Sequence, residues 1–269
     1  MKLEKSNYNF KPVEFSCDNI LSNKIKAPFP NRSFFLCIVG RPGSGKTSLL
    51  INCLTGKKSN RVYYKAFDKI LYVCPINSRK SIKNNPFDDL PEDQKFEKID
   101  DTVVKKILQI RDEFEENREV EKINDIIKPN MLTPEPIIKI DKPKKKKNRN
   151  QLLILDDVTA YLKDDPRILI ELSTNRRHLS LSIILLVQFL RSVPKSVRFQ
   201  ITDIVVFKPS NELDTKIIEE EYINLPKNHF KELKRFVWND KHDFLFINKD
   251  NDTYFKNLQK ITFDESNVI

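Results

Sequence analysis

Glycine is scarce in this chain, and the scarcity restricts the glycine-containing motifs that it can hold. The 269 residues include four glycines against 15 prolines, whereas glycine makes up about 7% of an average protein. Gly40, Gly43 and Gly45 stand close together, and Gly56 is the last glycine of the sequence. The D-x-x-G switch motif of a GTPase and the glycine-containing signature of a transporter-type ATPase are therefore excluded after Gly56. We expect the clustered glycines to serve a backbone that needs positive φ angles or close approach to a ligand.

Long apolar runs are missing as well, and so are paired metal-type cysteines. The longest apolar stretches, such as residues 183–187, fall far below the about 20 residues that cross a bilayer, and the N-terminal segment has no apolar signal region. The four cysteines form no C-x-x-C pair, and the three histidines share no metal-type spacing. We therefore expect buried free thiols, no structural zinc and no membrane segment in a soluble, intracellular protein.

Basic residues outnumber acidic ones, and part of the excess is concentrated in one block. Lys and Arg total 48 and Asp and Glu total 38, which gives a formal net charge of +10. Such a balance favours a polyanionic partner. Residues 142–149 (KPKKKKNR) contain six basic side chains and no acidic one. A block of this kind is typical of a solvated loop, and nucleic-acid contact or a nuclear-import signal is the alternative.

Short apolar runs alternate with helical patterns along most of the chain. Continuous apolar runs are typical of strands buried on both faces of a parallel sheet, and here they cover residues 34–39, 69–73, 152–155, 183–187, 204–207 and 244–247. Helical patterns cover residues 48–54, 160–177 and 212–236, the last with a break near Pro226. The alternation predicts an α/β fold, with a mostly parallel sheet and helices on both of its faces.

Changes of composition along the chain predict three parts. Residues 1–33 are polar and aperiodic and form an N-terminal arm, residues 34–250 form the α/β domain, and residues 251–269 form a C-terminal tail. Within the domain, residues 84–150 are rich in charge, with apolar positions at helical spacing between residues 103 and 114. We interpret this segment as a charged helical insertion at the edge of the sheet that ends in the basic block.

The sequence G-R-P-G-S-G-K-T at residues 40–47 matches the P-loop pattern G-x-x-x-x-G-K-[ST] in full. It follows a predicted strand and opens a predicted helix, so that backbone N–H groups and the helix dipole face a polyphosphate. We expect Lys46 to reach the β- and γ-phosphates of ATP, and the Thr47 hydroxyl to bind Mg²⁺. The predicted nucleotide-binding residues are Gly40, Arg41, Pro42, Gly43, Ser44, Gly45, Lys46, Thr47 and Ser48.

Polar residues end two of the predicted strands and complete the expected hydrolytic site. Asp156 and Asp157 follow the run LLIL, so we predict that Asp156 binds Mg²⁺ as a Walker B residue and that Asp157 orients or activates the attacking water. Asp157 is one methylene shorter than the Glu more usual in ATPases, and both residues can instead cap the next helix. Gln188 ends another buried strand, where it can sense the γ-phosphate or satisfy a loop backbone. These strand ends suit a hydrolase better than a nucleoside kinase.

Basic residues flank the strand that ends at position 188. Arg176 and Arg177 precede this strand. An exposed arginine there can act as an arginine finger on the nucleotide of a neighbouring subunit, or it can stabilise a helix end. The following loop carries three basic side chains, Arg191, Lys195 and Arg198. This loop can grip a phosphate backbone, or it can be a simple surface turn.

Together the motifs resemble the DNA-packaging ATPases of nucleocytoplasmic large DNA viruses and virophages, the poxvirus-type members of the FtsK/HerA superfamily. The resemblance covers residues 30–250 and rests on FLCIVGRPGSGKTS, LLILDDV and, most specifically, NRRHLSLSIILLVQ followed by VPKSVR. It implies a RecA-like P-loop NTPase core that assembles into a homo-oligomeric ring. The implied roles are Walker A for Lys46 and Thr47, Walker B for Asp156 and Asp157, strand-end sensor for Gln188 and trans-acting arginine for Arg177.

The same resemblance implies a function. The chain is expected to be a Mg²⁺-dependent, ATP-hydrolysing motor that drives double-stranded DNA into a viral capsid, with viral capsid proteins as further partners. Its expected location is the host cytoplasm or virus factory, or the virion itself. Two features depart from the family pattern: the long basic insertion before Asp156 and the absence of Glu at position 157. A nucleic-acid helicase or remodelling ATPase and a non-catalytic nucleotide-binding scaffold are the alternative functions.

Overall fold

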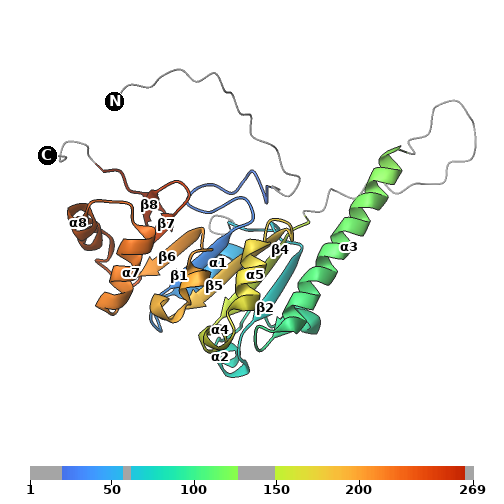
Figure 1. Cartoon of the computed structure of the whole chain (residues 1–269), viewed down its shortest axis with the longest axis horizontal. Coiled ribbons are helices and arrows are strands. Elements are labelled where there is room, and N and C mark those ends of the chain that lie inside the picture. Colours follow the sequence, from blue (N-terminus) through green and yellow to red (C-terminus); the bar gives the residue numbers. More distant parts are fainter. Residues whose placement is uncertain (1–19, 57–61, 127–148, 264–269) are drawn as a thin grey trace, which may run out of the picture.

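The computed structural model describes residues 20–56, 62–126 and 149–263, and its centre is one mixed sheet (Figure 1). Within these residues nine strands are hydrogen-bonded in the order β3-β2-β4-β5-β1-β6-β7-β8-β9. The strands from β3 to β6 in this order are parallel, and β7, β8 and β9 are antiparallel. The strand bounds are β1 Phe35–Val39, β2 Lys69–Val73, β3 Lys95–Phe96, β4 Gln151–Asp156, β5 Leu181–Val187, β6 Asp203–Phe207, β7 Phe244–Asn248, β8 Thr253–Lys256 and β9 Gln259–Lys260.

Helices cover both faces of this sheet (Figure 1). Successive side chains of a strand point to opposite faces, so Leu36 and Ile38 of β1 pack with Leu50 of α1, whereas Phe35 and Cys37 pack in the cluster that includes α3, α5, α7 and α8. The predicted α/β fold with a mostly parallel sheet is confirmed. The helix bounds are α1 Lys46–Thr55, α2 Ile76–Lys80, α3 Asp101–Ile126, α4 Thr159–Asp164, α5 Arg167–Thr174, α6 Lys195–Arg198, α7 Glu212–Tyr222 and α8 Lys227–Val237, with short 3-10 turns at Glu92–Gln94 and Leu190–Ser192.

Prolines decide where two of the predicted helical patterns divide. Residues 160–177 form two helices, α4 and α5, and not one, because Pro166 cannot donate a backbone hydrogen bond and Asp165 before it takes an extended conformation. Pro226 separates α7 from α8 in the same way, at the predicted break. The sequence pattern therefore places the helical segments correctly but overlooks one of the two interruptions.

The structured core reaches beyond residues 34–250 on both sides. Leu21, Ile25 and Phe29 are buried in the same apolar cluster as α1. Strands β8 and β9 extend the sheet to Lys260. Helix α3 covers the opposite end of the sheet (Figure 1). The basic block of residues 142–149 lies outside the described residues except for Arg149.

The cysteines that the structure describes agree with the expectation of buried free thiols. Cys37, Cys53 and Cys74 are buried free thiols, and burial raises the pKa of Cys53 to about 12 and that of Cys74 to about 11. Cys17 lies outside the described residues. Among the described helices, none combines the length and the apolar composition needed to cross a bilayer.

Candidate active site

The P-loop connects the carboxyl end of β1 to the start of α1, as the sequence predicts. Gly43 and Gly45 adopt φ angles of 72° and 110°, which side chains with a Cβ rarely tolerate. At Gly40 the constraint is steric, because a Cβ there would lie 2.6 Å from Ser44 Oγ and 2.8 Å from Phe207 Cβ. Three of the four glycines are thus required by the shape of this one loop.

Unpaired donors gather where the P-loop enters α1. Gly45 is the N-cap residue and supplies no side-chain cap, and the first turn of α1 holds no acidic residue. The first N–H groups of a helix have no partner within the helix, so this end of α1 favours an anion. The Ser44 hydroxyl is buried without a hydrogen-bond partner among the described residues. Backbone and side chain together form an anion cradle.

Lys46 lies over this cradle. Its ammonium donates hydrogen bonds to the carbonyl oxygens of Gly40 and Arg41, the latter at 3.2 Å. Burial lowers the pKa of Lys46, and the negative charges of Asp156 and Asp157 act in the opposite direction. The predicted phosphate-binding lysine and the two predicted Walker B carboxylates therefore belong to one electrostatic group.

The two neighbouring carboxylates have different surroundings. Asp156 is the last residue of β4, and burial, together with the charge of Asp157, raises its pKa to about 6. Asp157 is exposed, adopts a φ of 58° and accepts a hydrogen bond of 2.6 Å from the Ser78 hydroxyl of α2. No sequence motif connects α2 with the end of β4, so the contact of Ser78 with Asp157 was not predicted. The structure thus gives Asp157 a defined orientation.

Gln188 lies beside the P-loop because of the strand order. Strand β5 lies between β1 and β4, with Val187 opposite Val39 and Leu186 opposite Asp156. Gln188 is exposed just after β5 and lines a small cavity together with Gly40 and Arg41. All the residues predicted for nucleotide, metal and water contacts therefore meet at the carboxyl edge of the parallel strands.

Arg176 and Arg177 are the exception, because they precede β5 and so lie at the opposite edge of the sheet. Arg177 is exposed. Arg176 is half-buried and donates a hydrogen bond of 2.8 Å to the carbonyl oxygen of Ser173, and burial together with the charge of Arg177 lowers its pKa. Asp203, at the start of β6, is among the acids near Arg176. Neither arginine reaches the P-loop of its own chain.

Comparison with known protein families agrees with this arrangement. Residues 130–229 match the family described as Poxvirus A32 protein. The predicted family resemblance is thereby confirmed. The matching segment includes the strand that ends at Asp156, the strand that precedes Gln188 and the exposed Arg177, whereas the P-loop lies before it. No curated protein sequence matches the chain.

Two solved structures show the fold independently. The genome packaging NTPase B204 from Sulfolobus turreted icosahedral virus 2, in complex with ATP-gammaS, is similar with a TM-score of 0.50 and 15% identity, over 85% of this chain and 98% of B204. The pCW3 conjugation coupling protein TcpA, in a monomer form with ATPgS, gives a TM-score of 0.50 and 13% identity, over 87% of this chain and 61% of TcpA. The chain thus has the P-loop NTPase fold that the sequence predicts.

One of the three basic side chains in the loop that follows Gln188 does not fit the expected contact with a phosphate backbone. Arg198 is buried, pairs through two nitrogens with the Glu221 carboxylate at 2.7 Å each and donates to the Val193 carbonyl. A guanidinium held in this way fixes α6 against α7 and is not available to a phosphate backbone. Arg191 and Lys195 remain exposed.

His242 is a second residue of the site that no sequence motif indicates. Its Nδ1 lies 2.9 Å from the carbonyl oxygen of Ser44. Because that oxygen can only accept, Nδ1 carries the proton. The contact ties the loop before β7 to the tip of the P-loop, although the two residues are 198 positions apart.

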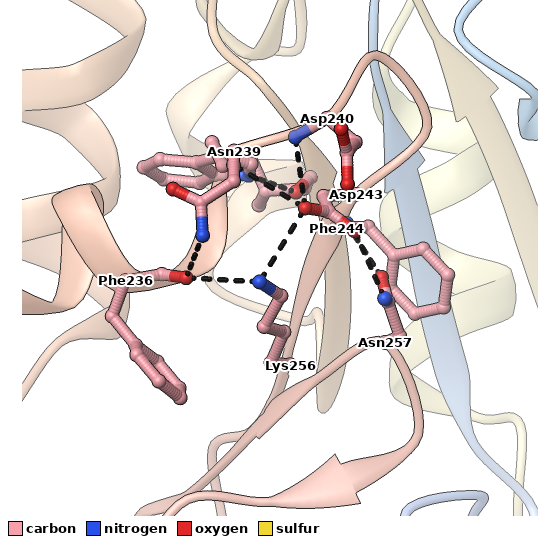
Figure 2. Close-up of polar contacts among 9 residues, drawn as sticks. Phe236, Asn239, Asp240, Asp243, Phe244, Lys256 and Asn257 are labelled. Atoms are coloured by element: carbon pink, nitrogen blue, oxygen red, sulfur yellow. Dashed lines mark hydrogen bonds and ion pairs between the residues drawn. The ribbon is translucent and has the colours of Figure 1, made fainter.

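The loop that carries His242 is held by Asp243, as Figure 2 shows. The Asp243 carboxylate accepts hydrogen bonds from the backbone N–H groups of Asn239 and Asp240 and from the Asn257 side chain, and it pairs with Lys256 at 3.5 Å. The hydrogen bond from Asn257 is the main reason why the pKa of Asp243 is lowered. A closed polar cluster thus fixes the residue next to His242.

Proposed function

We propose that this chain is a Mg²⁺-dependent ATPase that moves double-stranded DNA into a viral capsid. One observation carries the proposal: the P-loop, the Asp156-Asp157 pair and Gln188 all lie at the carboxyl edge of the parallel strands. They come together there because β5, which precedes Gln188, lies between β1 and β4. The family match and the likeness to B204, which is described as a genome packaging NTPase, support packaging as the purpose of hydrolysis. Double-stranded DNA, capsid proteins and further copies of the chain are the proposed partners.

The residues at the site fit ATP and Mg²⁺. Glycine conformations and the first turn of α1 present backbone N–H groups to a polyphosphate, and Lys46 adds a positive charge. Mg²⁺ prefers oxygen ligands, and the Thr47 hydroxyl and the Asp156 carboxylate supply them. The Thr47 hydroxyl makes no hydrogen bond within the described part of the chain, so it is available as a ligand.

In the proposed reaction, bound Mg²⁺ would neutralise negative charge on the β- and γ-phosphates. Lys46 exchanges the carbonyl oxygens of Gly40 and Arg41 for phosphate oxygens and stabilises the same charge. Asp157 has one carboxylate oxygen engaged by Ser78, and its other oxygen accepts a proton of the attacking water. Gln188 contacts the γ-phosphate or the water and passes the change to the loop that follows it.

Arg177 completes the site from a neighbouring subunit in this proposal. Its exposed position at the amino edge of the sheet excludes a contact with the P-loop of its own chain. A ring of subunits would bring the amino edge of one chain to the carboxyl edge of the next. An arginine supplied in this way contributes a factor of about 10³ or more to hydrolysis in related phosphoryl-transfer sites.

A steady-state ATPase assay of the assembled protein, with and without linear double-stranded DNA, tests the proposal. Hydrolysis is expected to require Mg²⁺ and to rise when DNA is added, and Lys46→Ala is expected to lower kcat about 100-fold or more. Lys105→Ala, on the exposed side of α3, is the control for loss of a lysine. Absent or DNA-independent hydrolysis would contradict the motor, and strand separation would favour a helicase.

A mixing experiment tests the neighbouring-subunit role of Arg177. Lys46→Ala and Arg177→Ala are each expected to be inactive alone. A mixture of the two variants is expected to regain part of the activity, because some interfaces combine an intact P-loop with an intact arginine. If the mixture stays as inactive as its components, Arg177 does not act across the interface.

A further inference from the structure

A groove of about 510 Å³ lies between α7 and α8, and half of the residues that line it are basic. Lys208, Lys231, Lys234 and Arg235 line it, against a single acidic residue, Glu212. No sequence motif marks these residues, and the longest basic block of the chain lies elsewhere. The charge of this surface is a product of the tertiary structure.

The α8 side of the groove is built from one helical stripe. Lys231 lies four residues after Lys227, and Lys234 and Arg235 lie three and four residues after Lys231, which places these side chains on one face of the helix. Lys231, Lys234 and Arg235 line the groove, and Lys227 extends the stripe beyond it. The other face of α8 buries Phe230, Leu233 and Val237. The stripe from Lys227 to Arg235 extends over about 12 Å at the usual helical rise.

The basic residues of this groove differ from other charged side chains in their ion pairing. Elsewhere in the described residues, Arg198 pairs with Glu221, Lys106 pairs with Asp93 and Lys95 pairs with Glu92. Within the same described part, no ion pair involves Lys208, Lys231, Lys234 or Arg235. Like charges at helical spacing destabilise a helix. An uncompensated cluster of this kind indicates an anionic partner.

Lys208 connects the groove to the candidate active site. It follows β6 and lines the groove, and it also lines the small cavity that contains Gly40, Arg41 and Gln188. A partner in the groove would therefore lie next to the segment that faces the nucleotide phosphates. This placement is the one expected for a surface whose contacts change with the nucleotide state.

We propose that the groove between α7 and α8 binds the phosphate backbone of double-stranded DNA. The proposal rests on the proposed motor function and assigns a DNA-contacting surface to it. A duplex offers one charge per about 1.7 Å of its axis, which suits a row of cations along a helix. Protein interfaces rely on apolar and aromatic anchors, whereas the aromatic residue of this groove, Trp238, is only 7% exposed. Because the groove is lined by basic side chains and its aromatic residue is buried, nucleic acid is a better candidate ligand for it than an acidic protein.

Binding of linear duplex DNA by the full chain, measured over a series of salt concentrations, tests this surface. The variant Lys231→Gln/Lys234→Gln/Arg235→Gln is expected to bind more weakly and to lower the slope of log affinity against log salt by about 2.7, since each lost phosphate contact removes about 0.9. Lys105→Gln on α3, at the other end of the sheet (Figure 1), is expected to leave affinity and slope unchanged. The basal ATPase activity, measured without added DNA, and the thermal unfolding of the triple variant are expected to match those of wild type, which shows that the variant folds.

The outcomes separate this inference from the motor function. Wild-type DNA binding with an unchanged slope in the triple variant would overturn the groove and leave the motor intact. Failure of wild type to bind DNA at all would contradict both. Loss of binding to an acidic capsid protein, with DNA binding unchanged, would assign the groove to a protein partner and overturn the proposal.

Discussion

The parallel and antiparallel halves of the sheet contribute to the candidate site in different ways. In the parallel half, the P-loop follows β1, Asp156 ends β4 and Gln188 follows β5, and each lies in a short segment with a recognisable pattern. In the antiparallel half, His242 precedes β7 and the basic stripe lies on α8, and neither belongs to a motif. Both halves nevertheless reach the same edge, because His242 contacts Ser44.

The difference follows from which atoms do the binding. A phosphate cradle made of backbone N–H groups demands particular φ angles and therefore particular residues in a fixed order. A binding surface made of side chains requires only that the fold brings those side chains together, so they can come from any positions in the sequence. We expect substitutions in the parallel half to abolish the chemistry and those in the antiparallel half to tune it.

A large effect is expected for Asp156→Asn in the parallel half. The substitution removes a charge from the proposed Mg²⁺ site while keeping the side-chain shape, so kcat should fall about 100-fold. An ATPase assay over a range of Mg²⁺ concentrations checks this. Asp164→Asn, exposed at the end of α4, is the matched control and should behave as wild type. Activity of Asp156→Asn within twofold of wild type would remove Asp156 from the metal site.

Asp203 joins the two halves, and we expect a stability effect there. It begins β6 and accepts hydrogen bonds from Thr202 at 2.7 Å and from Asn248 of β7 at 2.8 Å. Burial raises its pKa to about 7, and Asp250 acts in the same direction, whereas the two hydrogen bonds and Arg176 oppose the shift. The unfolded carboxyl group titrates near pH 4. Between pH 4 and 7 the folded state therefore binds more protons, and this group's contribution to the free energy of unfolding falls as pH rises.

Asp203→Asn is expected to remove that contribution. The free energy of unfolding, measured with urea, should fall between pH 4.5 and pH 7.5 in wild type. In Asp203→Asn this fall should be smaller by on the order of 3 kcal/mol. Asp250→Asn, an exposed neighbour, should change the pH dependence much less. Parallel pH curves for wild type and Asp203→Asn would show that Asp203 does not titrate in this range.

A smaller effect is expected for Ser78→Ala. Loss of the hydroxyl releases one oxygen of Asp157, so the carboxylate is less well oriented toward water, and kcat should fall about tenfold. The KM for ATP should stay constant, since Ser78 has no role in binding the nucleotide. Ser78→Thr keeps the hydroxyl and should recover activity. Ser81→Ala, which removes a hydrogen bond to the Ser78 carbonyl, separates the effect on Asp157 from a general loosening of α2.

The smallest effect is expected for His242→Ala in the antiparallel half. Removal of one hydrogen bond to the P-loop should weaken nucleotide binding about threefold and leave kcat nearly unchanged. Calorimetric titration with a non-hydrolysable ATP analogue measures this, and His229→Ala on α8 serves as the control. A loss as large as that of Asp156→Asn would break the distinction between the two halves.

Much of the fold could be predicted because parallel strands covered on both faces need continuous apolar runs. The strands predicted at residues 34–39, 69–73, 152–155, 183–187, 204–207 and 244–247 correspond to β1, β2, β4, β5, β6 and β7. The short strands β3, β8 and β9 were not predicted, because strands of two to four residues leave little pattern in the sequence. The division of α4 from α5 was missed, although Pro166 marks it.

The sequence by itself determined the phosphate cradle and its carboxylate partners, because backbone binding and strand-end chemistry leave patterns within a few consecutive residues. Tertiary structure alone decided that Ser78 holds Asp157, that His242 supports Ser44 and that Arg198 is engaged by Glu221. It also collected Lys208, Lys231, Lys234 and Arg235 into one groove. Each of these arrangements depends on contacts between segments that are distant in the chain, and the strand order of the sheet is what brings the segments together.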